Sequence, residues 1–209
     1  MLDQPHPARG GDSHELPAKR DHGARALAFP WWAALPSLLL LGLIVWGAAR
    51  DLQAGALVRA ADGQAGALEL SAALASLQRA VTLAPGDARA QLALAQVART
   101  LWIYRGTPAL KDQADRAFEE AGRLSPRWPA PHYEHARMYA LRERYQDALA
   151  LLAPALRLDP NNAGYWLERA RYEQALGHAA EARGAYARCD ALDEVRECEG
   201  ALKQLGGQP

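Results

Sequence analysis

The sequence predicts an all-α protein in which a solenoid of antiparallel helix pairs follows one membrane-spanning helix. Alanine and leucine dominate its 209 residues and only 7% are aromatic, a composition that favours helices over strands. A run of 21 residues, 29–49, carries no charge. Farther along the chain, an apolar segment ending in proline recurs, which is typical of a repeat architecture.

The N-terminal residues 1–28 are rich in Pro, Gly, His and charged side chains. Such a segment cannot bury a hydrophobic core, so we expect a disordered tail. In the whole chain, 24 basic and 24 acidic side chains cancel, and nothing indicates a nucleic-acid binder.

Residues 29–49 read FPWWAALPSLLLLGLIVWGAA. As a helix this run is about 31 Å long, which matches the hydrocarbon core of a bilayer. Trp31 and Trp32 lie at one end and Trp46 near the other, where aromatic rings favour the headgroup region. The apolar part of a signal peptide is shorter, about 7–15 residues, and a core helix is rarely uncharged for so long. We therefore expect an uncleaved single-pass anchor; a cleaved signal peptide is the alternative.

Flanking charges indicate the orientation only weakly, because three basic residues precede the apolar run and two follow it within a few turns. The Ala- and Arg-rich composition suggests a bacterial protein by association. In that setting we expect an inner-membrane protein whose tail is cytoplasmic and whose repeats face the periplasm.

The repeat is recognised by its prolines, Pro85, Pro126 and Pro160, which lie 41 and 34 residues apart. Another step of 34 reaches Glu194, where the frame continues without proline. Other positions keep the same phase. The small residues are Ala73, Ala114, Ala148 and Ala182, and Ala80, Ala121, Ala155 and Cys189; the bulky ones are Leu77, Phe118, Leu152 and Tyr186.

This pattern resembles the tetratricopeptide repeat (TPR), whose unit of about 34 residues is a helix pair. The resemblance covers residues 67–194. It implies about three full repeats plus a degenerate first unit, with residues 50–66 forming a linker or a degenerate helix. Residues 195–209 would form a capping helix and tail, because solenoids need a polar outer face at their ends.

In the TPR frame, the first helices of the full repeats begin near Asp87, Pro129 and Ala163. The repeat that starts at Asp87 carries seven extra residues, which either lengthen both of its helices or form a protruding loop. Pro154 falls inside a predicted second helix, where proline removes a hydrogen bond.

TPR proteins commonly bind peptides or helices in a concave groove lined by the first helix of each pair. Helical spacing predicts which side chains face that groove. The polar and aromatic ones are Arg89, Gln96, Arg99, Tyr133, Arg137, Arg171 and Gln174. Four arginines favour a partner segment with acidic side chains or a free carboxylate, because guanidinium groups match carboxylates. The alternative is that these arginines pair with acids of the solenoid such as Glu168 and Glu173.

Two further groups of residues have candidate chemistry. His132 and His135 lie one helical turn apart, but a structural zinc site needs four ligands, so we expect interfacial histidines and no bound metal. Cys189 and Cys198 are the two cysteines of the chain. In an oxidising compartment they can form a disulfide that fastens the cap, whereas in the cytoplasm Cys189 would simply replace the recurrent alanine.

The sequence has no Gly-rich phosphate loop and no GxSxG motif, so we expect neither an enzyme nor a cofactor or small-molecule substrate. It predicts a membrane-anchored scaffold for protein partners in a cell-envelope assembly, such as polysaccharide or pilus assembly, cytochrome maturation or export. Two alternatives stay open: a soluble periplasmic adaptor released by signal cleavage, and the regulatory subunit of a membrane glycosyltransferase or ligase.

Overall fold

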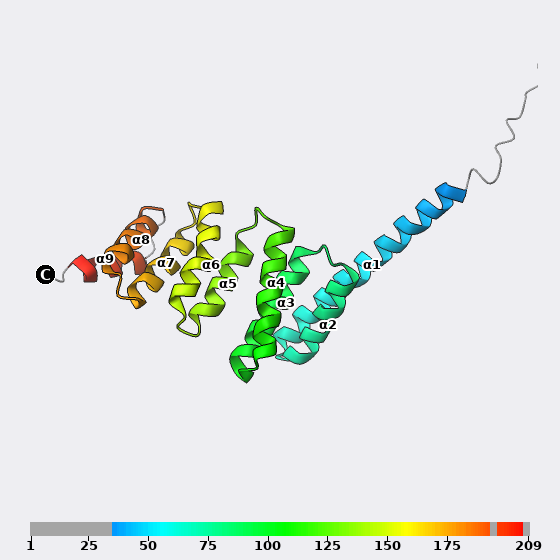
Figure 1. Ribbon diagram of the computed structural model, residues 1–209, viewed down its shortest axis with the longest axis horizontal. Helices are drawn as coiled ribbons and strands as arrows, with labels where there is room; N and C mark the ends of the chain where they lie inside the picture. Colours follow the sequence, from blue (N-terminus) through cyan, green and yellow to red (C-terminus); the bar gives the residue numbers. More distant parts are fainter. Residues whose placement is uncertain (1–34, 193–195, 207–209) are drawn as a thin grey trace, which may run out of the picture. The chain divides into compact units, whose positions relative to one another are not determined.

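The computed structural model describes residues 35–192 and 196–206, and this part of the chain is made of helices and short connections without a strand (Figure 1). The chain forms two units, residues 1–42 and 43–209. In the first unit the described residues are the beginning of helix α1. The second unit holds the rest of α1 and helices α2 to α9.

Helix α1, Leu35–Gly66, is one continuous helix, so residues 50–66 are helical. It is long and apolar enough to cross a membrane, and its most apolar stretch of 18 residues is not buried. Farther along, Ala54 and Ala61 are buried, and Ala61 belongs to the core shared with α2 and α3. The expected tail, residues 1–28, and the start of the expected membrane helix lie outside the described residues.

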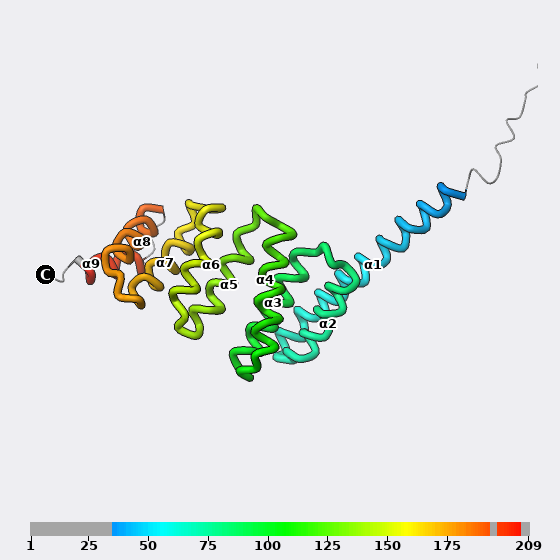
Figure 2. The backbone as a smooth tube through the Cα atoms, viewed as in Figure 1, coloured from blue at the N-terminus to red at the C-terminus, as the bar shows by residue number. Residues whose placement is uncertain are grey.

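The other helices follow one another as pairs. They are α2 (Leu70–Leu83), α3 (Ala88–Arg105), α4 (Pro108–Leu124), α5 (Ala130–Ala140), α6 (Tyr145–Leu158), α7 (Ala163–Ala175), α8 (Ala179–Leu192) and α9 (Arg196–Gly206). Helices α3 and α4, α5 and α6, and α7 and α8 pack as pairs, and each pair also contacts the next (Figure 2). The end of α1 shares a core with α2 and α3, and the Ser76 hydroxyl of α2 donates to the Gln64 side chain of α1 at 3.0 Å.

The small and bulky positions that repeat in the sequence form the core of this solenoid. The two alanine registers, Cys189 included, are fully buried in every repeat. Leu77, Phe118, Leu152 and Tyr186, the bulky residues between them, are buried as well. Small residues let neighbouring helices approach, and the bulky residue fills the space between pairs. The fold is the helix-pair solenoid that the registers predicted.

The seven extra residues lengthen both helices of one pair. Helices α3 and α4 have 18 and 17 residues, against 11 to 14 in α5 to α8. Two residues connect them, and Gly106 takes a left-handed conformation with φ of 67°, which glycine adopts without strain. Pro154 lies within α6, which continues to Leu158.

Candidate partner-binding groove

The first helices of the pairs, α3, α5 and α7, carry the predicted groove positions, and α3 also contacts α5 directly. Side-chain caps fix where two of these helices begin. The Asp87 carboxylate accepts hydrogen bonds from the amides of Arg89 and Ala90, and the Asn162 side chain accepts one from the amide of Tyr165. Of the predicted residues, the structure leaves Arg89, Arg137, Arg171 and Gln174 exposed, and partly buries Gln96, Arg99 and Tyr133.

Arg99 on α3 forms an ion pair with Glu134 on α5. Its Nη1 donates to the Glu134 carboxylate at 2.6 Å and to the Glu134 carbonyl oxygen at 3.3 Å. Both side chains are only 16% exposed, so solvent screens this pair weakly. Arg137 lies 3.4 Å from the other oxygen of the same carboxylate. Glu134 therefore joins two of the predicted groove arginines and ties α3 to α5.

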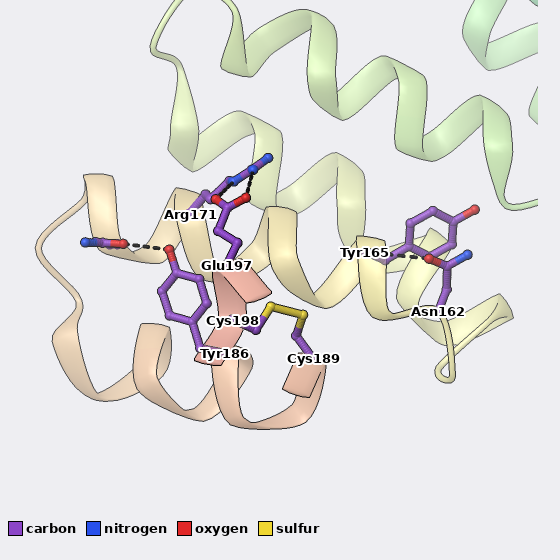
Figure 3. The surroundings of a disulfide bond; sticks show 8 residues. Asn162, Tyr165, Arg171, Tyr186, Cys189, Glu197 and Cys198 are labelled. Atoms are coloured by element: carbon purple, nitrogen blue, oxygen red, sulfur yellow. Dashed lines mark hydrogen bonds and ion pairs between the residues drawn. A yellow bond between two sulfur atoms is a disulfide. The ribbon is translucent and has the colours of Figure 1, made fainter. Parts of the chain in front are cut away.

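Arg171 on α7 has a similar arrangement at the C-terminal end. It pairs with Glu168 of its own helix at 2.9 Å, and its guanidinium donates through two nitrogens to the Glu197 carboxylate of α9 (Figure 3). The hydrogen bonds from Arg171 to Glu197 raise the pKa of the Arg171 guanidinium above its ordinary value, although burial opposes this. The pair links α7 to the cap helix.

These contacts form what we call the ion-pair row, which runs along the first helices. It consists of Arg99, Glu134, Arg137, Glu168, Arg171 and Glu197. Glu134 and Glu168, like Arg137 and Arg171, lie 34 residues apart, so the row follows the repeat. The alternative offered by the sequence named Glu168, which does pair with Arg171, whereas Glu134 was left out although it lies one repeat before Glu168. Three of the four predicted arginines thus have acidic partners within the solenoid.

Tyrosine rings of α5 and α6 pack against tyrosine rings of α7. The ring centroids of Tyr133 and Tyr165 are 4.8 Å apart, and those of Tyr145 and Tyr172 are 6.0 Å apart. Burial raises the pKa of the Tyr133 and Tyr165 hydroxyls. The Arg137 guanidinium lies 5.6 Å from the centre of the Tyr133 ring, within the range of a cation–π contact. Tyr133 of the predicted groove therefore packs against Tyr165 of the next repeat, with Arg137 beside it.

A polar cluster that the sequence did not indicate joins α4 to α5. Lys111 donates to the Asp115 carboxylate at 2.7 Å and to the Tyr139 hydroxyl at 3.0 Å, and the His135 ring lies 2.9 Å from the other Asp115 oxygen. Burial alone would raise the pKa of Asp115, but the hydrogen bonds from Lys111 and His135 outweigh it and lower that pKa. The cluster holds the two helices together beside the stacked rings of Phe118 and His135.

His132 lies in a different setting from His135. Its ring lies against Gly122 of α4. A Cβ atom added at Gly122 would lie 3.2 Å from a carbon of the His132 ring. Burial, and then the nearby His135 and Arg157, lower the pKa of His132. Among the described residues, no group of His, Cys, Asp and Glu side chains is placed to hold a metal ion.

At the end of the solenoid, the structure joins Cys189 of α8 and Cys198 of α9 in a buried disulfide (Figure 3). Their Cα atoms are 6.1 Å apart. The Arg183 side chain also donates to the Leu205 carbonyl oxygen at 2.6 Å, which connects the same two helices. The covalent link and the Arg171–Glu197 pair fasten α9 over the last repeat.

Comparison with known proteins supports the repeat fold through structure rather than sequence. No family model matches the chain, and no curated protein matches it in sequence. TTC0263, a thermophilic TPR protein of Thermus thermophilus, is 21% identical with a TM-score of 0.53, over 73% of this chain and 80% of that one.

Two other solved structures have the same architecture. PilF of Pseudomonas aeruginosa is 18% identical with a TM-score of 0.58, over 77% of this chain and 80% of that one. YrrB, a TPR protein with an unusual peptide-binding site, is 21% identical with a TM-score of 0.50, over 66% of this chain and 68% of that one. At such identities the likeness concerns the fold alone, and together with the buried registers it shows that this chain has the TPR fold.

Proposed function

We propose that this protein is a non-catalytic scaffold, anchored in a membrane by residues 29–49, whose groove binds a segment of a partner protein. One observation carries the proposal. The first helices of successive repeats carry a stripe of exposed or half-buried arginine, glutamine and tyrosine side chains along a TPR solenoid, and solenoids generally bind partners along such extended surfaces. YrrB, which shares the fold, is described as peptide-binding, and this supports a groove of the same general use.

The anchor rests on the exposed apolar part of α1. Its side chains from Leu35 to Trp46 are exposed, which a soluble protein rarely tolerates over a continuous apolar surface. The Arg50 guanidinium lies 4.7 Å from the centre of the Trp46 ring, a pairing suited to the interface between lipid and water. We place the repeats in the periplasm of a bacterial inner-membrane protein, where the Cys189–Cys198 disulfide would persist.

The partner's segment is proposed to carry acidic side chains or a free carboxylate that approaches Arg89 and Arg137. Arg89 is exposed, and 44% of the Arg137 side chain is exposed. Arg99 and Arg171 instead support the groove, because they pair with Glu134 and Glu168 at 2.6 and 2.9 Å, whereas the Glu134 oxygen lies 3.4 Å from Arg137. Gln96 remains available for hydrogen bonds to a peptide backbone, since an amide both donates and accepts. The Gln174 side-chain oxygen accepts from the Tyr186 hydroxyl at 2.7 Å, which leaves the Gln174 amide nitrogen to donate.

The biological setting we propose is a cell-envelope assembly of the kinds named above. A soluble periplasmic adaptor and a regulatory subunit of a membrane glycosyltransferase or ligase are the competing proposals. The first needs cleavage after the apolar run, and the second predicts that an enzyme in the same membrane depends on this protein for its activity.

The anchor is tested by fractionating cells that produce the full chain with alkaline phosphatase or a fluorescent protein fused to its C-terminus. Active phosphatase in the membrane fraction is expected. Active phosphatase in the soluble periplasmic fraction would favour the cleaved adaptor, whereas fluorescence alone would place the repeats in the cytoplasm and contradict the proposed side.

The groove is tested by placing the photo-crosslinking residue benzoylphenylalanine at Tyr133 in the full chain and identifying the crosslinked proteins by mass spectrometry. A discrete partner is expected at Tyr133, and crosslinking should be lost when Arg89→Glu and Arg137→Glu reverse the charge of the groove. Arg79→Glu, a change at an exposed arginine of α2, is the matched control. Unchanged crosslinking in the Arg89 and Arg137 variant would contradict the acidic preference.

A further inference from the structure

The opposite end of the solenoid has a cavity that the ion-pair row does not reach. It measures about 340 Å³ and lies between α1, α2 and α3. Its floor is formed by small or buried apolar residues, among them Ala61, Ala65 and Val97. The alanines of α1 and α3 leave this space because they carry no side chain beyond Cβ. The cavity has the size of a large apolar side chain with room around it.

Two large side chains stand at the rim of this cavity with most of their surface in solvent. Leu68, in the turn between α1 and α2, is 82% exposed, and Tyr104, in the last turn of α3, is 78% exposed. A tyrosine and a leucine beside an apolar pocket are the kind of pair that closes around an inserted side chain in protein interfaces.

Leu68 is held at the rim by an unusual backbone conformation. Its φ is 63°, in the left-handed region where the residue after a helix is usually glycine. The amide of Leu68 donates to the Ala65 carbonyl oxygen and the amide of Glu69 donates to the Gln64 carbonyl oxygen, the two bonds that close this type of helix end. The chain thus places an exposed leucine at a position where glycine would be less strained, and folding alone gives no reason for it.

The polar groups around the cavity indicate what kind of segment fits it. Among the described residues that line it, Asp62 is the charged one, and Glu69 follows Leu68 in the chain; both residues are exposed. Arg105, the cation next to Tyr104, donates to the Ser71 hydroxyl at 2.8 Å. Gln96 also lines the cavity, and its side-chain amide can pair with a peptide backbone.

We infer that the α1–α3 cavity binds one apolar side chain of a partner segment that carries lysine or arginine beside it. Asp62 and Glu69 attract the basic residues, Gln96 binds the backbone, and Leu68 and Tyr104 cover the inserted side chain. This inference rests on the proposed function and gives the groove a second, chemically different end, in addition to the acidic preference near Arg137.

The test uses the full chain in detergent micelles and a fluorescein-labelled probe peptide, Gly-Lys-Ser-Leu-Ser-Lys-Gly, followed by fluorescence anisotropy. Matched peptides replace both lysines by glutamate, or the leucine by alanine. We expect saturable binding of the lysine–leucine peptide and at least about tenfold weaker binding of either matched peptide. Equal binding of the glutamate peptide, or no binding of the probe, would overturn the inference.

Variants of the protein locate the binding. Tyr104→Ala removes the rim, and Ala93→Leu fills the cavity from α3; each should weaken the probe at least about tenfold. Leu141→Ala, at an exposed leucine of another turn, and Ala180→Leu, at an exposed alanine of α8, should leave binding unchanged. Probe binding that survives Ala93→Leu would place it elsewhere and overturn the inference. Crosslinking at Tyr133 does not use the probe peptide. If a partner is crosslinked there but the probe does not bind, this inference is wrong and the proposed function is not contradicted.

Discussion

The two ends of the solenoid differ in how their side chains find partners. From α3 to α9 the charged side chains meet one another, with Arg99 on Glu134 and Arg171 on Glu168 and Glu197. Between α1 and α3 a cavity stays open, with Leu68 and Tyr104 exposed beside it. A run of arginines in a sequence therefore does not by itself identify a binding surface. A better indication is an exposed side chain that neither pairs with nor packs against another residue of the solenoid.

The difference also concerns how each end of the solenoid is closed. At the C-terminal end a disulfide and an ion pair hold α9 against the last repeat. At the N-terminal end, α1 contributes Ala61 to the core that α2 and α3 share, and the same helix includes the apolar segment. Repeat arrays open most readily at their ends, so the covalent link stabilises an end that would otherwise fray.

The largest expected effect is loss of the disulfide. Replacing Cys189 and Cys198 together by alanine should lower the free energy of unfolding of the C-terminal repeat by about 2–3 kcal/mol, because a short closed loop is released in the unfolded chain. Urea unfolding followed by circular dichroism, with hydrogen exchange of α8 and α9, measures this.

The control for the disulfide is the unaltered chain treated with dithiothreitol, which should reproduce the loss, while the double variant should not respond to the reductant. Binding of the lysine–leucine peptide in the α1–α3 cavity should be the same in both. A fall in probe affinity on reduction would show that the two ends of the solenoid are coupled.

The second effect compares the coupling energies of two ion pairs of the ion-pair row, Arg99 with Glu134 and Arg171 with Glu197. A double-mutant cycle of Arg99→Ala and Glu134→Ala should give a coupling energy of about 1–2 kcal/mol, because the pair is largely shielded from water. The cycle of Arg171→Ala and Glu197→Ala should give about 0.5 kcal/mol, since these side chains are 42% and 49% exposed. Thermal unfolding of the single and double variants measures both, and a larger coupling at Arg171 would contradict the role of burial.

The repeat registers predicted the fold because they describe the core. A small residue recurring at Ala73, Ala114, Ala148 and Ala182 has a packing reason that a single sequence reveals, and each is fully buried. The length of α3 and α4 was left open, since seven extra residues fit either longer helices or a loop. The short turn at Gly106 shows that the extra residues lengthen the two helices and form no loop.

The groove was predicted less completely, for a physical reason. Helical spacing places Arg99 and Arg171 on one face, but it does not say which acidic side chain of another helix lies opposite. Glu197 is 26 residues from Arg171, and the two meet because α9 folds back over α7. The α1–α3 cavity could not be predicted from the sequence, because it depends on how closely three helices pack around small side chains. Leu68 carries no sequence signal of its left-handed conformation.

The third effect is a gain of stability at the open end. Leu68→Gly should raise the free energy of unfolding by about 0.5–1 kcal/mol, because glycine adopts the left-handed conformation with less strain and the exposed leucine loses little burial. Thermal unfolding measures this gain, and fluorescence anisotropy measures how tightly the same variant binds the probe peptide. Higher stability with weaker probe binding is expected. If the variant is less stable, Leu68 packs within the fold and its place at the rim has a structural reason.

The smallest expected effect is the pH dependence that His132 contributes between α4 and α5. Burial lowers its pKa below the ordinary value of about 6.5, so the folded chain binds fewer protons at this ring than the unfolded chain does. The stability from the neutral ring is present above about pH 6.5 and is lost as the pH falls through the lower pKa of the folded state. His132→Gln, which stays neutral, should flatten the change in free energy of unfolding between about pH 7 and 5 by less than about 1 kcal/mol. Urea unfolding at several pH values measures this, and an unchanged slope would show that the pKa of His132 does not differ between the folded and the unfolded chain.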